Sequence, residues 1–335
     1  MENEYAELKQ LVKQEGLLDK QPVYYTYKIL LTLCLLAASL SILVVVDNLW
    51  LQLLNAAFFA VVFTQIGLVA HDAGHLQIFR SASRSSIILL PVIFFIALDL
   101  SWWLEKHNRH HRNPNHIDLD WDINLPIIGF TREQVLAKRG LYRFIAKYQA
   151  YFIFFAQFLE AFSARLDSIK YLIHGKKVRY LAIESLLMAA HFAVYLALLF
   201  YFLSAWHAIL FIIVHQGIFG FYLSMIFATN HKGMQIIYEG NRLGFIREQV
   251  VTARDVKSNF IISFLYGGLE YQIEHHLFPN MPRNNLRKAK KIVKPFCEER
   301  GIPYCEAGIF ESYIQITKYL HKVSAVLRNP DKISV

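Results

Sequence analysis

Four long apolar stretches constrain the fold of this chain more than any other feature. They cover about residues 29–46, 51–70, 183–203 and 207–229. A helix needs about 20 predominantly apolar residues to cross the hydrocarbon core of a bilayer. Of the whole chain, 55% of the residues are hydrophobic and 15% are aromatic, which is typical of membrane proteins. The sequence therefore predicts an all-α integral membrane protein with four transmembrane helices.

Two further apolar stretches are predicted to lie at the membrane surface instead of crossing it. Residues 86–104 are long enough to cross, but Pro91 and Asp99 make them a poor lipid-facing span. Histidine-rich groups flank this stretch, HDAGH at 71–75 and HNRHH at 107–111. A crossing here would place these two groups on opposite faces of the membrane. We therefore expect an interfacial or re-entrant helix. Residues 150–162 are too short to span and lie among charged residues, which predicts an amphipathic helix on the membrane surface.

The distribution of positive charge predicts the orientation of the chain. All 35 Lys and Arg residues lie before the first span, between the second and third, or after the fourth, and none lies in the two short links. Cytoplasmic loops are enriched in Lys and Arg. Both termini and the segments 71–182 and 230–335 are therefore predicted to be cytosolic, where the two segments form a helical cap. The first run follows a polar lead-in and lacks a small-residue cleavage site, so we expect a retained span and not a signal peptide. Residues 1–335 are expected to form a single domain.

Histidines occur in four places that this arrangement brings to one side of the membrane. The groups are HDAGH at 71–75, HNRHH at 107–111, NH at 230–231 and QIEHH at 272–276. Side chains three and four residues apart share one face of a helix, so each larger group offers two or three ring nitrogens to one point. Neutral imidazole suits iron, zinc, copper and nickel, and eight ligands are too many for one tetrahedral ion. The histidines therefore predict a centre of two metal ions.

Most other histidines and the cysteines are expected to play no part in this centre. His116, just past the second group, is kept as a further candidate ligand. The histidines expected to be ordinary core or surface residues are His174, His191, His207, His215 and His321. The three cysteines form no CxxC pair, which predicts neither a disulfide framework nor an iron–sulfur site.

The boxes HxxxH, HxxHH and QxxHH, in this order, resemble those of the membrane fatty-acid desaturase family. About 30 residues separate the first two boxes, and a long gap holding two spans precedes the third. The resemblance covers about residues 25–300. The stretches FATNHKGM at 227–234 and GGLEYQIEHHLFPNMPRNNL at 267–286 resemble bacterial acyl-CoA desaturases in particular. The glutamine at the head of the third box, Gln272, also resembles front-end desaturases.

The resemblance implies two iron ions and O₂ as co-substrate, used to introduce a cis double bond into a fatty acyl chain. The implied iron ligands are His71, His75, His107, His110, His111, His231, His275 and His276. Gln272 stands where other desaturases carry a ninth histidine, and we expect it to bind weakly or through water. A metal-bound histidine usually donates its other N–H to a carboxylate or carbonyl. The residues expected to orient the histidines are Asp72, Asp118, Asp120, Asp122, Asn230 and Glu274.

The implied reaction also predicts partners. Dehydrogenation of an alkyl chain requires an oxidant stronger than any side chain, which the cofactor supplies. The acyl chain, of an acyl-CoA or an acyl-lipid, is expected in an apolar tunnel, and SWW at 101–103 and FGFYLSMIF at 219–227 are candidate lining segments. The sequence contains no HPGG haem loop, so the two electrons are expected from a separate donor: ferredoxin, cytochrome b5 or a flavin- and iron–sulfur-containing reductase. The basic stretch at 286–300 is a candidate surface for acyl-CoA phosphates or for an acidic donor. Membrane lipids border the spans, and a bacterial cell membrane is favoured over the endoplasmic reticulum.

Other functions remain open from the sequence. A hydroxylase or acetylenase of the same superfamily shares these boxes. A zinc protease is disfavoured because HDAGH lacks the glutamate that serves as general base in HExxH. A histidine-rich metal transporter would be expected to hold its ligands near the bilayer midplane, whereas these histidines lie at span ends. Nucleic-acid binding is disfavoured for so apolar a chain.

Overall fold

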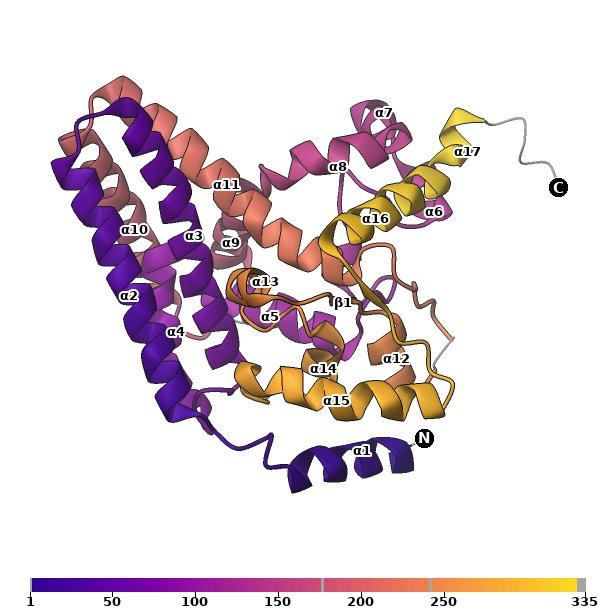
Figure 1. The fold of residues 1–335 in the computed structure, drawn as a ribbon. Coiled ribbons are helices and arrows are strands. Elements are labelled where there is room, and N and C mark those ends of the chain that lie inside the picture. The colour runs from indigo at the N-terminus through magenta and orange to yellow at the C-terminus, as the bar shows by residue number, and fades with distance from the viewer. Residues whose placement is uncertain (1, 176–177, 241–242, 330–335) are drawn as a thin grey trace.

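The computed structural model describes residues 2–175, 178–240 and 243–329, and these residues are predominantly helical. Among them, four helices are long and apolar enough to cross a membrane: α2 (Pro22–Val45), α3 (Leu49–Gly74), α10 (Leu181–Phe202) and α11 (Ala205–His231). They form the elongated bundle at the left of Figure 1. The predicted all-α fold with four candidate spans is confirmed. The helices extend past the predicted spans at several ends, and α3 continues through most of the first histidine box.

Helix α3 lies at the centre of the bundle. In its most apolar window 67% is buried inside the protein, against 22% for α2 and 22% for α10. It packs against α2 and α11, and large side chains such as Phe59, Phe63 and Phe211 fill the contact. Gln52 at the start of α3 donates to the carbonyl oxygens of Ile42 and Val46, so the turn that joins α2 to α3 satisfies exposed backbone groups. The first histidine box therefore ends the most enclosed helix of the bundle.

The stretch at 86–104 does not form one straight helix. It belongs to α4 (Ala82–Ile96) and α5 (Leu100–Arg112), whose axes differ by 109°. Ala97 has a left-handed backbone, with φ of 52°, and ends α4. Asp99 then caps α5, because its carboxylate accepts a hydrogen bond from the Trp102 amide at 2.6 Å. The reversal agrees with the predicted re-entrant geometry and turns the second histidine box back toward the first.

The stretch at 150–162 does not form the single amphipathic helix predicted for it. It is divided between α8 (Gln149–Gln157) and α9 (Glu160–His174), with a break at Phe158 and Leu159. Apolar side chains are exposed over much of α8 instead of forming one stripe, as at Tyr151 and Phe155. The elements that precede α8 are η1 (Trp121–Ile123), α6 (Arg132–Ala137) and α7 (Gly140–Lys147).

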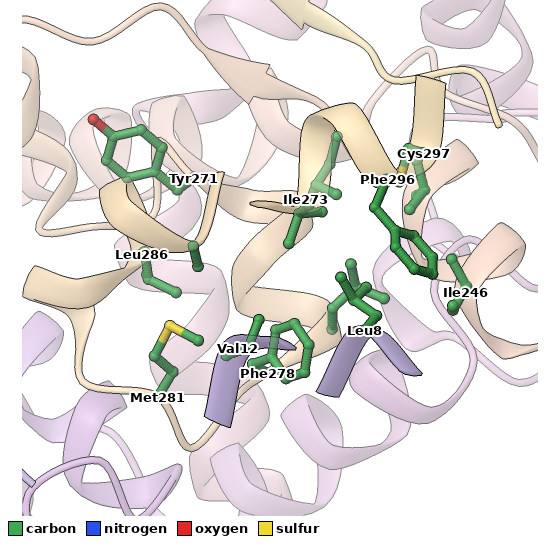
Figure 2. Packing of buried hydrophobic residues seen from close by; sticks show 14 of the residues in the cluster. Leu8, Val12, Ile246, Tyr271, Ile273, Phe278, Met281, Leu286, Phe296 and Cys297 are labelled. Atoms are coloured by element: carbon green, nitrogen blue, oxygen red, sulfur yellow. The ribbon is translucent and has the colours of Figure 1, made fainter. Parts of the chain in front are cut away.

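The remaining elements form the cap, which in Figure 1 extends from α1 and α15 at the bottom to α16 and α17 at the upper right. Its elements are α1 (Glu2–Gln14), α12 (Phe245–Val251), β1 (Asp255–Val256), α13 (Phe260–Tyr266), α14 (Gln272–Leu277), α15 (Arg283–Glu299), β2 (Glu306–Ala307), α16 (Ile309–Val323) and α17 (Ala325–Arg328). The strands β1 and β2 pair in parallel. Figure 2 shows the main apolar core of the cap, where Leu8 and Val12 of α1 pack with Phe278 and Phe296. The first helix of the chain thus packs against the segment that carries the third histidine box.

Candidate metal centre

Four helices, α3, α5, α11 and α14, bring all eight predicted ligands to one place. His71 lies in the last turn of α3 and His75 directly follows that helix. His231 is the last residue of α11. Helix α5 carries His107, His110 and His111, and α14 carries His275 and His276. The third box extends for only six residues of helix, so its position depends on the packing of α14 against α12 and α15.

The eight histidines form two adjacent groups. In the larger group, one ring nitrogen of each of five histidines lies within 4.8 Å of those of the others: His71, His75, His107, His111 and His275. The smaller group, within the same limit, comprises His110, His231 and His276. The groups meet where the rings of His111 and His276 stack with centroids 4.3 Å apart. Five and three ligands in contact suit two metal ions better than one.

The ring nitrogens are arranged as metal-facing atoms would be. The Nε2 atoms of His75 and His107 are 2.7 Å apart, and those of His110 and His231 are 3.3 Å apart. Such a contact is either one N–H···N hydrogen bond or, where both rings carry their proton on Nδ1, a pair of facing lone pairs that can bind a cation. The buried Nε2 atoms of His71 and His276 have no hydrogen-bond partner among the described residues. Unpartnered buried nitrogens of this kind fit a centre built for cations.

Burial keeps most of these rings neutral. The pKa values of His75, His107, His111, His275 and His276 lie well below the ordinary value, because burial disfavours the charged ring and neighbouring imidazoles repel a second charge. A neutral ring keeps the lone pair that a metal requires.

His110 differs from these rings because acids face it. Burial alone would lower its pKa, but the adjacent carboxylates of Asp120 and Asp122 raise it above the ordinary value. The Asp120 carboxylate lies 2.9 Å from Nδ1 of His110. Such a carboxylate fixes the ring orientation and leaves Nε2 to face the centre.

Other side chains and one backbone carbonyl hold three further rings. Asp72 lies 3.4 Å from Nδ1 of His71 and forms a buried ion pair with Arg283 at 3.1 Å. His231 donates from Nδ1 to the carbonyl oxygen of Thr252. His276 donates from Nδ1 to Oε1 of Gln249, at 2.8 Å. The sequence predicted Asp72 and Asp120 for such contacts and missed Gln249 and Thr252, which lie on or beside α12, outside every motif.

Two of the predicted supporting acids point elsewhere. Glu274 accepts a hydrogen bond from the hydroxyl of Tyr304 at 2.7 Å, on the cap side of α14, and its other oxygen has no partner among the described residues. Asp118 is exposed. Glu274 therefore contacts Tyr304, because the side chain before His275 on a short helix faces away from the ring that follows it.

Gln272 and Asn230 lie at the edge of the smaller group. Nε2 of Gln272 is 2.9 Å from Nε2 of His231. Asn230 donates from Nδ2 to Oε1 of Gln272 and to the carbonyl oxygen of Leu269, both at 2.8 Å. The Gln272 amide is therefore next to the metal-facing atom of a predicted ligand.

The remaining histidines stay apart from the two groups. His116 bonds to the carbonyl oxygen of Ile117. His191 bonds to the carbonyl oxygen of Phe94, and His215 lies 2.7 Å from the hydroxyl of Tyr195 inside the bundle. The surface of the chain carries His174 and His321. None of these joins a metal-type group within the described residues.

A largely apolar cavity of about 450 Å³ opens beside the histidines. His71, His107, His110 and His231 contribute to its wall. Trp102 and Trp103 line it, as do Leu223, Ser224, Ile226 and Phe227, so parts of both predicted segments form its surface. Its volume lies in the range of small-molecule sites in proteins, which is about 300–1,000 Å³.

The fold and the site together define a helical membrane protein with a histidine-lined centre suited to metal ions beside an apolar cavity. A family model described as fatty acid desaturase matches residues 48–308, and the chain belongs to that family. The acyl-lipid (9-3)-desaturase of the moss Physcomitrium patens is 30% identical over 335 residues, which cover 96% of this chain and 62% of the moss protein. A Delta(6)-fatty-acid desaturase of Caenorhabditis elegans is 27% identical over 329 residues, which cover 93% of this chain and 73% of the nematode protein.

These comparisons also bear on the other expectations. This chain spans less than two thirds of the length of the moss relative. Family membership argues against the metal transporter. Both relatives come from eukaryotes, so the preference for a bacterial membrane gains no support and stays a prediction.

Proposed function

We propose that this chain is an iron- and O₂-dependent fatty acyl desaturase that introduces a cis double bond into an acyl chain held in the cavity. The observation that carries the proposal is the convergence of eight imidazoles in two groups, four of which line a largely apolar cavity. The names of the relatives support desaturation of fatty acyl groups. Two electrons per turnover then come from a donor such as ferredoxin, cytochrome b5 or a flavin- and iron–sulfur-containing reductase.

The eight histidines are proposed as the ligands of two iron ions. When bound, the irons supply the oxidising power for removal of two hydrogens, which no side chain has. Asp120, the Thr252 carbonyl and Gln249 orient the rings of His110, His231 and His276, respectively. Gln272 is proposed to position His231, since its amide oxygen already accepts from Asn230.

The cavity is proposed to hold the acyl chain extended beside the histidines and away from water. Its wall is largely aliphatic and aromatic, which favours a hydrocarbon and fixes which carbons face the centre. We further propose that the histidines face the cytosol. The short links between α2 and α3 and between α10 and α11 contain no Lys or Arg, as expected for segments on the other side.

The direct test is fatty-acid profiling by gas chromatography and mass spectrometry in a host that expresses the chain with an electron donor. A new unsaturated acyl species, absent when His276→Ala is expressed, is expected, and its fragmentation gives the double-bond position. A hydroxylated product would instead identify the alternative reaction of the superfamily. No product from iron-loaded protein with a working donor would overturn the proposal.

A pair of variants tests the assignment of ligands. His107→Ala removes a member of the larger group and is expected to abolish turnover while the protein stays in the membrane. His191→Ala removes a ring that bonds to the Phe94 carbonyl, and it is expected to retain most activity. Loss of activity in His191→Ala together with full activity in His107→Ala would reverse the assignment.

A further inference from the structure

A group of helices beside the bundle presents large apolar side chains on its surface. It consists of α6, α7, α8, α16 and α17 and is here called the lateral arm. Helices α8 and α16 pack on each other and both contact α11, and in Figure 1 they lie on the side of α11 opposite α2. Tyr151 and Phe155 on α8 are 61% and 73% exposed, and Phe310 and Ile314 on α16 are 85% and 54% exposed. Helix α7 exposes three further apolar residues, Leu141, Tyr142 and Phe144.

The apolar surface of the lateral arm continues the surface of the bundle. Phe158 directly follows α8, and its ring stacks on the ring of Phe221 in the candidate span α11 with centroids 4.8 Å apart. Lipid that surrounds α11 at this level therefore also reaches α8. Exposed aromatic side chains are enriched where the hydrocarbon core of a bilayer meets water. A large apolar patch of this kind marks a contact surface for lipid or for another protein.

The lateral arm is also basic. Residues 132–157 and 309–328 contain eight Lys and Arg residues but only two acids, Glu133 and Glu311. Glu311 lies 3.8 Å from Lys257, which is outside the lateral arm. Within the described part of the chain, none of the eight basic residues forms an ion pair. They are Arg132, Lys138, Arg139, Arg143, Lys147, Lys318, Lys322 and Arg328.

Basic and apolar residues alternate along the helices of the lateral arm. Arg139 and Arg143 are exposed at α7, beside its exposed apolar residues. On α16, Lys318 and Lys322 are exposed one and two turns after Ile314. A long cationic side chain can lay its methylene groups on apolar surface and keep its charge at the level of lipid phosphates. This alternation is typical of helices that lie at the boundary between acyl chains and headgroups.

We infer that the lateral arm is immersed in the membrane leaflet on the side of the histidines and binds anionic phospholipid headgroups through its basic residues. Anionic headgroups are favoured over zwitterionic ones, because each Lys or Arg near the surface strengthens the attraction by about fivefold. A soluble protein partner is disfavoured, because the apolar patch is continuous with the lipid-facing surface of α11. The inference requires no assumption about the reaction.

The lateral arm also forms part of the candidate site. Ile153 and Gln157 of α8 line the apolar cavity. The hydroxyl of Tyr313 on α16 donates to Oε1 of Gln157 at 3.1 Å, and Gln149 of α8 donates to the carbonyl oxygen of Leu320 on α16. These bonds hold the two helices together. A leaflet that holds the lateral arm therefore also supports one wall of the cavity.

Quenching of a fluorophore by lipid measures the immersion directly. The three native cysteines, Cys34, Cys297 and Cys305, are first replaced by Ala. One cysteine at a time is then introduced and labelled with bimane. The purified protein is reconstituted into vesicles in which some of the lipid carries a nitroxide on its acyl chain. A nitroxide quenches only a fluorophore that enters the leaflet.

Labels on the lateral arm are expected to behave like labels on a span. Phe155→Cys and Ile314→Cys should be quenched as strongly as Leu33→Cys, because Leu33 is exposed on α2. Leu11→Cys is the matched control. Leu11 is also an exposed apolar residue, at 39%, but it lies on α1 at the bottom of Figure 1 and should be quenched little.

A comparison of two lipids tests the basic residues. With the label at Ile314→Cys, nitroxide phosphatidylglycerol is expected to quench more strongly than nitroxide phosphatidylcholine. The added pair Lys318→Gln and Lys322→Gln should reduce this preference by about fivefold or more and leave quenching by phosphatidylcholine unchanged. The matched control is Arg287→Gln with Lys288→Gln, two exposed basic residues of α15, which should keep the preference.

Three results would overturn the inference. Arm labels quenched as little as Leu11→Cys would mean that the lateral arm lies in water or is covered by a second copy of the chain. Equal quenching by the two lipids would refute the binding of anionic headgroups. An equal loss of preference in the α15 control would assign the selectivity to the net charge of the protein. These measurements need no iron, electron donor or turnover, so they are independent of the proposed function.

Discussion

Asn230 donates a hydrogen bond to Oε1 of Gln272 and thereby turns the Gln272 amide nitrogen toward His231. Asn230 precedes His231 at the end of α11, while Gln272 begins α14, so the bond links a span to the third histidine box. A second bond from Asn230 to the Leu269 carbonyl fixes the asparagine itself. The smaller histidine group therefore depends on a residue that follows no histidine-box pattern.

We expect Asn230→Ala to weaken binding of the iron ion proposed for the smaller histidine group by about tenfold or more, as loss of a supporting contact does. The Gln272 amide would lose its restraint and His231 its fixed neighbour. Iron content after dialysis against graded chelator measures the effect. Asn48→Ala, which removes the cap at the opposite end of the bundle, is the control. Equal iron retention in both variants would contradict the role of Asn230.

The ion pair of Asp72 with Arg283 joins the first histidine box to the cap. The side chains are 2% and 3% exposed, so Arg283→Met leaves a buried carboxylate unpaired. Loss of one partner of such a pair costs about 3–5 kcal/mol. The free energy of unfolding, measured by denaturation in detergent, should show this loss. The double variant Asp72→Asn with Arg283→Met should lose less stability, because it leaves no unpaired charge. Arg300→Met removes an exposed pair with Glu7 and should change stability by less than about 1 kcal/mol. Equal losses for the two Arg variants would contradict the assignment.

Gly220 allows α11 to touch the break between α8 and α9. A Cβ at this position would meet the Ala161 amide nitrogen at 2.8 Å and the Gln157 carbonyl oxygen at 3.0 Å, and both are backbone atoms. Gly220→Ala is therefore expected to lower stability by about 1–3 kcal/mol, as overpacking does. At Gly217 the added Cβ would meet only a Phe158 ring atom at 3.5 Å, so Gly217→Ala should be neutral or stabilising. Thermal unfolding of the two variants compares them, and a more stable Gly220→Ala would refute the close approach.

The buried acids Glu274 and Asp255 predict how stability depends on pH. Burial raises the pKa of Glu274 well above its ordinary value, and burial also raises that of Asp255. The folded state therefore holds a proton that the unfolded state has released, and stability falls as the pH rises above the ordinary carboxyl pKa. Glu274→Gln cannot ionise, so it should lose less stability than the parent between pH 5 and pH 8.

This comparison requires protein stripped of metal by chelation, because metal binding to histidine is itself pH-dependent. Thermal unfolding at the two pH values is the measurement. Glu299→Gln, on the exposed end of α15, should follow the parent chain. A steeper loss in Glu274→Gln than in the parent would mean that Glu274 is ionised in the folded state.

The sequence predicts the spans and the histidine set because both depend on patterns among residues close together in the chain. A long apolar run and an i, i+3, i+4 spacing need no knowledge of the rest of the chain. The reversal at 97–99 was also accessible, since Asp99 interrupts the apolar run and caps the next helix. The prediction of a surface or re-entrant stretch followed from the need to bring His71 and His107 together.

Features that depend on tertiary contacts were not accessible in this way. The break at Phe158 and Leu159 lies opposite Gly220, on a helix that comes much later in the chain. Gln249 supports His276 only because α12 packs on α14. Glu274 faces Tyr304 because the fold of the cap places that hydroxyl next to it. The residues near Glu274 in the sequence do not predict this contact.

The packing of α1 on the cap also sets the order in which the protein is completed during synthesis. Chains emerge from the ribosome with the N-terminus first. Leu8 and Val12 therefore cannot pack against their core partners until Phe278 and Phe296 have been translated. The two histidine groups are likewise incomplete until His275 and His276 have been translated. The cap and the group of eight histidines can consequently be completed only after all four candidate spans have been made.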